Sequence, residues 1–470
     1  MPNMSHLKTP SRELDPEVRC NNFEEVCKGY TNEMAVCEAM RCLDCATKPC
    51  VSGCPVNVNI PLFIKRITEE DYLGAYSIIL ETNSFPAICG RVCPQESQCE
   101  AKCVRSSKGD PVAIGRLERF VADYYSGLNN EIEKIDENYN LRYSNIDTER
   151  VALIGSGPAS LSCASDLVKF GFDVTVFEAF HTTGGVLVYG IPEFRLPKNI
   201  VKSEISELKK LGCKFRNNIV VGKTFTIDDL FKVGYSAVFI GTGAGVPAFL
   251  NIPGENLVGV FSANEYLTRI NLMKAHIPKY DTPLFKSKRV AVIGGGNVAM
   301  DAARCAVRCG AEKVFNIYRR SETEMPARIE EITHAREEGV RFISLANPVE
   351  ILGENADGVN RVNSVKCIRM DLGEPDESGR RKPFEVLGSE FEIEVDTVIV
   401  AIGTSPNPIL SRNTHGLDLN ERGLIKTDEK CRTSRKFVYA GGDAVTGAAT
   451  VISAMGAGKI AAQTIMDDFS

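Results

Sequence analysis

The sequence has no long hydrophobic run. Its first thirty residues contain no apolar stretch of the kind found in signal peptides, and no segment reaches the roughly 18 uncharged apolar residues that predict a membrane span. It also has no basic stripe, since 55 Lys and Arg residues are outnumbered by 61 Asp and Glu residues and the net charge is -6. These absences argue against a secreted, membrane-spanning or nucleic-acid-binding protein, so we expect a cytoplasmic chain.

Histidine is scarce, whereas cysteine is abundant. Only 5 histidines are present and none lies between residues 7 and 180, whereas 11 of the 17 cysteines precede residue 104. In a reducing compartment such dense cysteine spacing indicates metal or redox chemistry rather than a disulfide framework. The six later cysteines are scattered. Cys305 and Cys309 share one face of a predicted helix, where we expect them to pack as small hydrophobic side chains.

Two cysteine runs stand in the first quarter of the chain. The first, "RCLDCATKPCVSGCP" (Arg41–Pro55), has the spacing C-x2-C-x4-C-x3-C-P, which is close to a ferredoxin pattern in which the fourth thiolate serves a second cluster. By that analogy Cys54 begins a second iron–sulfur site, and the run "CGRVCPQESQCEAKC" (Cys89–Cys103) supplies the missing ligands. The first site would take Cys42, Cys45 and Cys50. A pair of zinc sites is the alternative, but there is a single C-x2-C knuckle and no histidine nearby.

A dinucleotide-binding pattern begins at Arg150. The strand "VALI" leads into Gly155-x-Gly157-x-x-Ser160 and an amphipathic helix, and a second strand, "DVTVFE", ends on Glu178. Glycines permit the tight turn and a close approach to pyrophosphate, the helix N-terminus faces the phosphates, and the acid accepts hydrogen bonds from a ribose. Ser160 is a small replacement for the third glycine. The alternative is an ordinary βαβ unit, but strand, turn, helix, strand and acid all fall in order.

The same unit recurs at Arg289, with a different ending. Its turn and the start of its helix are formed by Gly294, Gly296, Asn297 and Val298. The second strand, "KVFNIY", is followed by Arg319 and Arg320 instead of an acid. Guanidinium groups pair with a 2′-phosphate that a carboxylate would repel, so we expect FAD in the first unit and NADP(H) in the second. The alternative is that the two arginines mark a solvated strand end.

The order of these signals predicts an insertion. The strands "AVFIGTGAG" (Ala237–Gly245) and "TVIVAIGTSPNP" (Thr397–Pro408) each stand where the chain would leave one nucleotide unit for the other. Near the C-terminus, "FVYAGGDAVTGAATVISAMGAGKIAAQTI" predicts a strand, a turn and a helix, with Asp443 placed to bind the ribityl or phosphate side of a flavin. FAD signals therefore lie on both sides of the NADP unit, which we expect to be inserted in the FAD domain.

Motifs along essentially the whole chain resemble one known family. They are "AMRCLDC", "CGRVCPQ", "GSGPAS", "GGVLVYGIPEFRLPK", "GGGNVAMDAAR", "YRRSETEMPAR" and "AGGDAVTGAATVISAMGAGK". They are similar to those of the small (β) subunit of NADPH-dependent glutamate synthase. Its relatives include the large subunit of the NADH-dependent ferredoxin:NADP oxidoreductases and the N-terminal part of dihydropyrimidine dehydrogenase.

The resemblance implies two 4Fe-4S clusters with specific ligands. One cluster would be held by Cys42, Cys45, Cys50 and Cys103. The other would be held by Cys54, Cys93 and Cys99. In relatives the eighth ligand is an oxygen donor, and the matching position is Glu118, which we prefer over Cys89, the candidate from thiol count alone.

The resemblance also implies the nucleotide-binding residues. For FAD they are Gly155, Gly157, Pro158, Ala159, Glu178, Gly185, Leu187, Gly243, Gly442, Asp443 and Thr450. For NADP(H) they are Gly294, Gly296, Asn297, Val298, Arg319, Arg320 and Arg328.

The expected architecture is α/β, with a helical iron–sulfur domain and two Rossmann-like domains. A chain of 470 residues with 43% hydrophobic and 25% charged residues has room for about two to four domains. The expected ranges are 1–128 for the cluster domain, 129–149 for a linker, 150–287 and 398–470 for the FAD domain, and 288–397 for the NADP domain.

The expected activity is electron transfer from NADPH through FAD and two clusters to a partner subunit. The cofactors perform the hydride step, so no side chain is nominated as catalytic. Thioredoxin reductase, which shares the tandem units, needs a C-x-x-C pair in the NADP domain that this sequence lacks. No glutaminase or FMN barrel fits beside these units, so we expect a hetero-oligomer. Its partner would be a glutamate synthase large subunit or a ferredoxin-type flavin subunit, and the rival is a relay protein with a vestigial NADP site.

Overall fold

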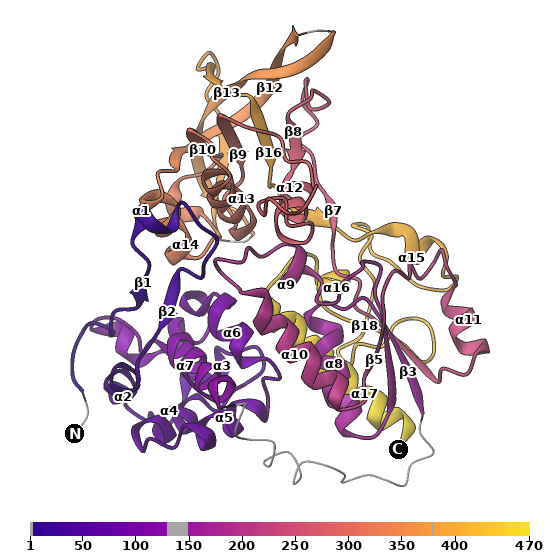
Figure 1. The fold of residues 1–470 in the computed structure, drawn as a ribbon. Coiled ribbons are helices and arrows are strands. Elements are labelled where there is room, and N and C mark those ends of the chain that lie inside the picture. The colour runs from indigo at the N-terminus through magenta and orange to yellow at the C-terminus, as the bar shows by residue number, and fades with distance from the viewer. Residues whose placement is uncertain (1–2, 129–148, 357, 378) are drawn as a thin grey trace.

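The computed structural model describes residues 3–128, 149–356, 358–377 and 379–470, arranged as three lobes (Figure 1). A helical lobe contains the N-terminus, and two further lobes are each built on a parallel sheet. This confirms the fold class expected from the sequence. The expected linker, 129–149, lies almost entirely outside the described residues. Within those residues no helix is both long enough and apolar enough to cross a membrane.

The helical lobe consists of short helices. They are α2 (Asn32–Ala39), α3 (Pro49–Ser52), α4 (Ile60–Thr68), α5 (Tyr72–Leu80), α6 (Pro86–Val92) and α7 (Ile114–Gly127), with short 3-10 turns at Gln95–Ser97, Glu100–Lys102 and Val104–Ser107. A proline in the first turn starts α3, α4 and α6, where its missing N–H has no helical partner to lose. In α4 the buried residues Ile60, Phe63, Ile64 and Ile67 recur at helical spacing, so one face packs into the core.

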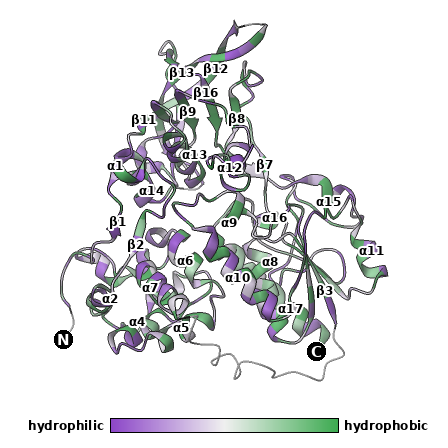
Figure 2. Cartoon of the chain, in the orientation of Figure 1, coloured by the Kyte–Doolittle hydropathy of each residue, from purple (hydrophilic) through white to green (hydrophobic). Residues whose placement is uncertain are grey.

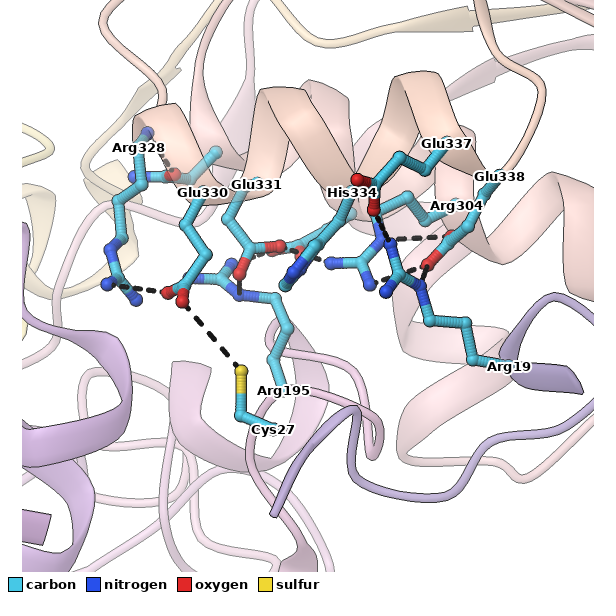
Figure 3. A network of polar contacts seen from close by, with 12 residues as sticks. Arg19, Cys27, Arg195, Arg304, Arg328, Glu330, Glu331, His334, Glu337 and Glu338 are labelled. Atoms are coloured by element: carbon cyan, nitrogen blue, oxygen red, sulfur yellow. Dashed lines mark hydrogen bonds and ion pairs between the residues drawn. The ribbon is translucent and has the colours of Figure 1, made fainter. Parts of the chain in front are cut away.

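An N-terminal arm, residues 12–29, extends from this lobe to the lobe of the second sheet (Figure 1). It comprises β1 (Arg12–Glu13), α1 (Pro16–Arg19) and β2 (Cys27–Gly29), and β1 pairs antiparallel with β2. Val26 belongs to the apolar core of the second-sheet lobe, and its amide donates to the carbonyl of Phe194 at 3.0 Å. Figure 3 shows the arm residue Arg19 against Glu337 and Glu338 at the end of α14 (Ile329–Glu337).

The first parallel sheet combines the two ends of the sequence. Its strand order is β18 (Val438–Ala440), β6 (Ala237–Ile240), β3 (Arg150–Ile154), β4 (Asp173–Phe177) and β5 (Lys214–Arg216). Around it lie α8 (Pro158–Lys169), α9 (Val186–Tyr189), α10 (Lys198–Lys210), α11 (Ile227–Lys232), α15 (Pro408–Arg412), α16 (Asp443–Thr446) and α17 (Val451–Phe469). The C-terminal helix α17 packs along α8 (Figure 1). This lobe is therefore built from segments that precede and follow the second sheet in the sequence.

The second parallel sheet has the order β11 (Arg341–Ser344), β10 (Lys313–Tyr318), β9 (Arg289–Ile293), β16 (Thr397–Val400) and β8 (Val260–Ser262). Its helices are α12 (Ala263–Asn271), α13 (Asn297–Arg308) and α14. Because β8 pairs with β16, β8 and the following α12 belong to this lobe, whereas residues up to 287 were expected in the FAD domain. The strands of both sheets are predominantly hydrophobic, as in parallel sheets covered on both faces (Figure 2).

The chain crosses between the two sheet lobes at a pair of short strands. It leaves the first lobe through β7 (Val246–Pro247) and returns through β17 (Thr404–Ser405), and the two pair antiparallel. This arrangement agrees with the expected insertion. Beyond the second sheet, an antiparallel extension is formed by β12 (Ala346–Ala356), β13 (Val359–Pro375), β14 (Arg381–Glu385) and β15 (Phe391–Glu394).

Candidate functional site

The first glycine turn lies between β3 and α8. Gly155 has a φ of +92°, and a Cβ there would stand 2.5 Å from the carbonyl oxygen of Gly241, so only glycine fits. Gly157 precedes α8, and a Cβ there would meet nothing within 4 Å. The backbone amides at the start of α8, next to Pro158 and Ala159, therefore face open space of the kind that a pyrophosphate needs.

Glu178 lies directly after β4 and faces this turn. Its buried carboxylate accepts hydrogen bonds from the amide of Ser156 at 3.0 Å and from the amide of Phe180 at 2.8 Å. The carboxylate is thereby fixed beside the glycine turn. The Ser156 hydroxyl also donates to it at 2.5 Å, which leaves about one of its four lone pairs for a ribose hydroxyl.

Two other segments approach the same turn. Gly185, in the "GGVLVYG" loop, has a φ of +55°, and its Cβ would lie 2.8 Å from the Cα of Gly157. Leu187, two residues later, is fully buried beneath the loop. Gly243, after β6, has a φ of +65° and an open side. The loop thus lies directly against the turn, so a nucleotide bound at the turn would contact both.

The C-terminal part of the first lobe completes this site. Gly442 has a φ of +68°, and its Cβ would be 3.1 Å from the Cβ of Ala159. Asp443 accepts a hydrogen bond from the amide of Ala449 at 3.2 Å, and burial raises the pKa of its carboxyl group. Thr450 caps α17 by accepting from the amide of Ser453 at 3.2 Å. Residues distant in sequence therefore meet at one end of the first sheet.

The second glycine turn repeats the geometry of the first. Gly294 has a φ of +141°, and a Cβ there would stand 2.3 Å from the carbonyl oxygen of Ala401. Gly296 precedes α13 and has an open side. Asn297 accepts a hydrogen bond from the amide of Arg328 at 3.0 Å, and Val298 is 42% exposed. The start of α13 is thus accessible to a ligand.

The three expected phosphate-binding arginines have different surroundings. Arg319, directly after β10, is exposed and has no hydrogen-bond or ion-pair partner among the described residues. Arg320 is buried, and its guanidinium donates to the carbonyl of Arg381 at 2.8 Å and to Asp376 at 2.5 Å. Arg319 is therefore the one of this pair whose guanidinium is free to meet an added phosphate.

The side chain of Arg328 points into the helical lobe. Its guanidinium donates to the carbonyl of Arg91 at 2.9 Å, to Gln95 at 3.1 Å and to Glu330 at 3.0 Å. In this structure the side chain joins two lobes, although its backbone lies beside Asn297. No sequence pattern indicates this contact, because the arginine and its partners in the helical lobe are more than 200 residues apart.

One group of thiols lies at the surface of the helical lobe. Cys42, Cys45, Cys50 and Cys103 are all half-buried and line one small cavity, with Ile60, Ile64 and Leu43 among its apolar walls. Burial and the neighbouring thiols of Cys42 and Cys103 raise the pKa of Cys50 to about 11. These four residues, the outer group, are the set that the resemblance implied for one cluster.

A second group lies deeper. Cys93 and Cys99 are buried, Cys54 is half-buried, and the three thiols adjoin the carboxylate of Glu118. Burial raises the pKa of Glu118 to about 8, although a hydrogen bond from Asn83 at 2.6 Å acts to lower it. Thiols with raised pKa values stay protonated until a metal replaces the proton. Both groups also offer converging donor atoms in apolar surroundings. The residues therefore fit iron–sulfur clusters. We name this second set the inner group.

Cys89 lies beside the inner group and also contacts residues outside it. Its buried thiol is 3.5 Å from the side-chain oxygen of Asn83 and 3.5 Å from the sulfur of Met455 on α17. It also contacts Cys93. Geometry therefore brings both Cys89 and Glu118 to the inner group, and the choice between them as ligand stays a prediction.

Comparisons with family models divide the chain as the structure does. Residues 19–129 match the model described as dihydropyrimidine dehydrogenase domain II, 4Fe-4S cluster. Residues 149–458 match the model described as pyridine nucleotide-disulphide oxidoreductase. The first match contains both cysteine groups, and the second contains both glycine turns.

Similar sequences extend over nearly the whole chain. It is 35% identical over 466 residues to a glutamate synthase (NADPH) small chain from Halomonas elongata, covering 96% of each chain. It is 34% identical over 473 residues to the Escherichia coli protein of that name, covering 99% of this chain and 97% of that one. It is also 38% identical over 442 residues to the NADP(+)-dependent formate dehydrogenase subunit beta of Moorella thermoacetica, covering 89% of this chain and 59% of that protein.

Solved structures share the two sheet lobes. Mycobacterium tuberculosis FprA in complex with NADPH matches 68% of this chain and 85% of its own, with a TM-score of 0.56 and 21% identity. T. acidophilum thioredoxin reductase matches 68% of this chain and 97% of its own, with a TM-score of 0.51 and 24% identity. At these identities the likeness establishes the fold alone.

Proposed function

Because the chain belongs to the glutamate synthase (NADPH) small-chain family, we propose that it is an NADPH-oxidising flavin and iron–sulfur subunit that passes electrons to a partner. The observation that supports this most directly is the contact between α17 and residues next to the inner cysteine group: the thiol of Cys89 is 3.5 Å from the sulfur of Met455, and Pro55 lies against Gly456. This helix begins at the residues proposed to bind FAD, and Gln98 of the cluster lobe donates to Thr450 at its start, at 3.5 Å.

When bound, FAD would supply the two-electron acceptance of a hydride from NADPH and the one-electron transfer that iron–sulfur clusters need. The chain's own residues position these groups. The first glycine turn, Glu178 and Asp443 would bind FAD, and the second glycine turn with Arg319 would bind NADPH. No side chain is required as an acid or base at the hydride step.

The difference in burial between the cysteine groups supports a direction for the electron path. Cys93 and Cys99 of the inner group are buried, as the ligands of an intermediate carrier should be. The outer group is half-buried and adjoins the exposed side chains of Leu43 and Val104. Electrons would therefore leave through the outer group to an acceptor on another subunit.

The proposed partner is a glutamate synthase large subunit, in a cytoplasmic complex. The two small chains named above span this chain almost end to end, which favours this assignment. The alternative is the large subunit of an NADH-dependent ferredoxin:NADP oxidoreductase. Other relatives are beta subunits of different enzymes, including an NADPH-Fe(3+) oxidoreductase of Geobacter sulfurreducens, 34% identical over 450 residues.

Two experiments test the proposal. Protein purified without oxygen should contain FAD and about 8 iron atoms, as two cubanes require, and NADPH should reduce an artificial dye through it. Protein without acid-labile sulfide, or without NADPH-dependent dye reduction, would contradict it. Co-purification from the native source should then yield a companion of glutamate synthase large-subunit size, with FMN and glutamine-dependent NADPH oxidation. A small companion with its own FAD and a two-iron cluster would instead support the alternative.

A further inference from the structure

Four side chains with metal-binding atoms meet where the N-terminal arm contacts α14. They are Glu13 on β1, Cys27 on β2, and Glu330 and His334 on α14. One ligand atom from each residue lies within 4.8 Å of those of the other three. Figure 3 shows the Cys27 thiol directed at Glu330, with His334 further along α14. None of the four belongs to either of the cysteine groups described above.

The local structure explains why these side chains converge. Glu13 and Cys27 are direct cross-strand partners in the β1–β2 ladder, so their side chains lie on the same face. Glu330 and His334 are four residues apart on α14, so they share one face of that helix. Each element thus presents a pair of donors, and the two pairs face each other.

The donor set is one that zinc prefers. A thiolate, an imidazole and carboxylates are the usual zinc ligands, arranged as a tetrahedron. Bond lengths of about 2.0–2.3 Å place tetrahedral ligands roughly 3.3–3.8 Å apart. The four donors lie within 4.8 Å of one another, so they need to contract by about 1.5 Å at most. We propose that Glu13, Cys27, Glu330 and His334 form a zinc site that fastens the N-terminal arm to the second nucleotide-binding lobe.

The surrounding charges suit such a site. Zinc bound by one thiolate, one neutral imidazole and two carboxylates carries a net charge of about -1. Arginines flank both carboxylates. Arg328 is 3.0 Å from one oxygen of Glu330, Arg116 is 3.5 Å from the other, and Arg19 is 3.8 Å from Glu13. They offset the remaining negative charge and hold the carboxylates in position, as outer-shell partners of metal sites do.

An ion can reach the four ligands. All of them line one cavity of about 370 Å³ between the arm, the helical lobe and α14. Burial and the nearby carboxylates of Glu330 and Glu13 raise the pKa of Cys27 to about 12, so zinc would displace one proton from the thiol on binding. Without zinc, His334 is 3.0 Å from Glu13, and the Cys27 thiol is 3.9 Å from Glu330. That metal-free ion pair and hydrogen bond are the competing state.

The test uses the holoprotein, purified without oxygen from cells supplied with zinc. Elemental analysis should find about one zinc ion per chain in addition to the iron. X-ray absorption at the zinc edge should show one sulfur at about 2.3 Å and three nitrogen or oxygen atoms at about 2.0 Å. Zinc absent from the protein, or zinc surrounded only by sulfur as it would be in a cluster site, overturns the proposal.

Matched variants assign the ligands. Cys27→Ser and His334→Gln should each lower zinc affinity at least about tenfold, the smallest loss typical of changes around a metal, while iron and flavin contents stay unchanged. Cys37→Ser and His415→Gln replace exposed residues of the same types elsewhere and should keep the zinc. Zinc content that is unaffected by Cys27→Ser, or lost equally in the control variants, contradicts the assignment.

Discussion

Replacing Arg319 with glutamine should weaken NADPH binding and leave NADH binding unchanged. Arg319 follows β10 at the position where a nucleotide-binding unit selects between a ribose hydroxyl and a 2′-phosphate. It is exposed and has no partner among the residues described by the structure. Its neighbour Arg320 is already bound to Asp376 and to the carbonyl of Arg381, so the two arginines should not contribute equally.

The size of the effect follows from the type of bond. A hydrogen bond to a charged group contributes about 1.5–3 kcal/mol, and because Arg319 is exposed we expect the lower part of this range, about 1.5–2 kcal/mol. At about 1.4 kcal/mol per factor of ten, this loss corresponds to a decrease of about 10- to 30-fold in kcat/KM for NADPH. NADH has no 2′-phosphate, so its kcat/KM should change by less than about twofold.

The assay is anaerobic dye reduction with each nucleotide. Arg320→Gln should affect NADPH and NADH to the same extent, because it breaks contacts to the extension beyond the sheet. The control for a general loss of positive charge is Arg341→Gln. Arg341 is exposed at the first position of β11, at the other end of these parallel strands. An equal loss for both nucleotides in Arg319→Gln, or a selective loss of NADPH in Arg320→Gln alone, would refute the reasoning.

The remaining predictions concern the clusters and the arm. Cys54→Ala should lower the iron content from about 8 to about 4 atoms and leave the cluster of Cys42 assembled, as judged by iron analysis and electron paramagnetic resonance. Glu118→Ala should alter the spectrum of the inner cluster and Cys89→Ala should not, and the reverse result would make the thiol the ligand. Burial would raise the pKa of Glu338, but hydrogen bonds from two arginines of α13 outweigh it and lower the pKa to about 2. The ionised carboxylate therefore stabilises the fold fully above its unfolded pKa of about 4.3, and this contribution disappears as the pH falls through about 2. Urea unfolding at pH 7 should show Glu338→Gln destabilised by about 3–5 kcal/mol, and a loss below about 1 kcal/mol would contradict the role given to this buried pair.

The features that the sequence predicted are those determined within short stretches of chain. Gly155 and Gly294 have positive φ values, and the backbone after a neighbouring strand leaves no room for a Cβ at either position. The spacing of the glycines in the sequence predicts both turns. Cys305 is fully buried in the core of the second lobe, as its helix face suggested. The spacing of the cysteines likewise assigns Cys54 and Cys42 to different groups, because it depends on fewer than fifteen consecutive residues.

Features that depend on contacts between distant segments could not be predicted in this way. Nothing in the sequence near β8 shows that this strand pairs with β16, about 140 residues later, because a short apolar strand fits either sheet. The sequence predicts Arg320 as a phosphate ligand, but in the structure its guanidinium donates to Asp376 of the extension. The arm was missed because its strands have only two and three residues, too few to give a periodic pattern.

The two sides of the cluster lobe are joined to the nucleotide-binding lobes by different interactions. Toward the first lobe the contact is mainly apolar: the buried cores of the two lobes form one continuous cluster in which Cys89 meets Met455, and Gln98 adds a hydrogen bond to Thr450. Toward the second lobe the contacts are charged, through Arg328 and the arm. The contacts with the first lobe place the inner group beside the start of α17, where we propose that FAD binds, as electron transfer between FAD and the inner cluster would require. The charged side chains are largely buried, and the zinc site that we propose lies among them, so this contact fastens the arm to the second lobe. The two contacts thus hold the cluster lobe to both nucleotide-binding lobes by different means.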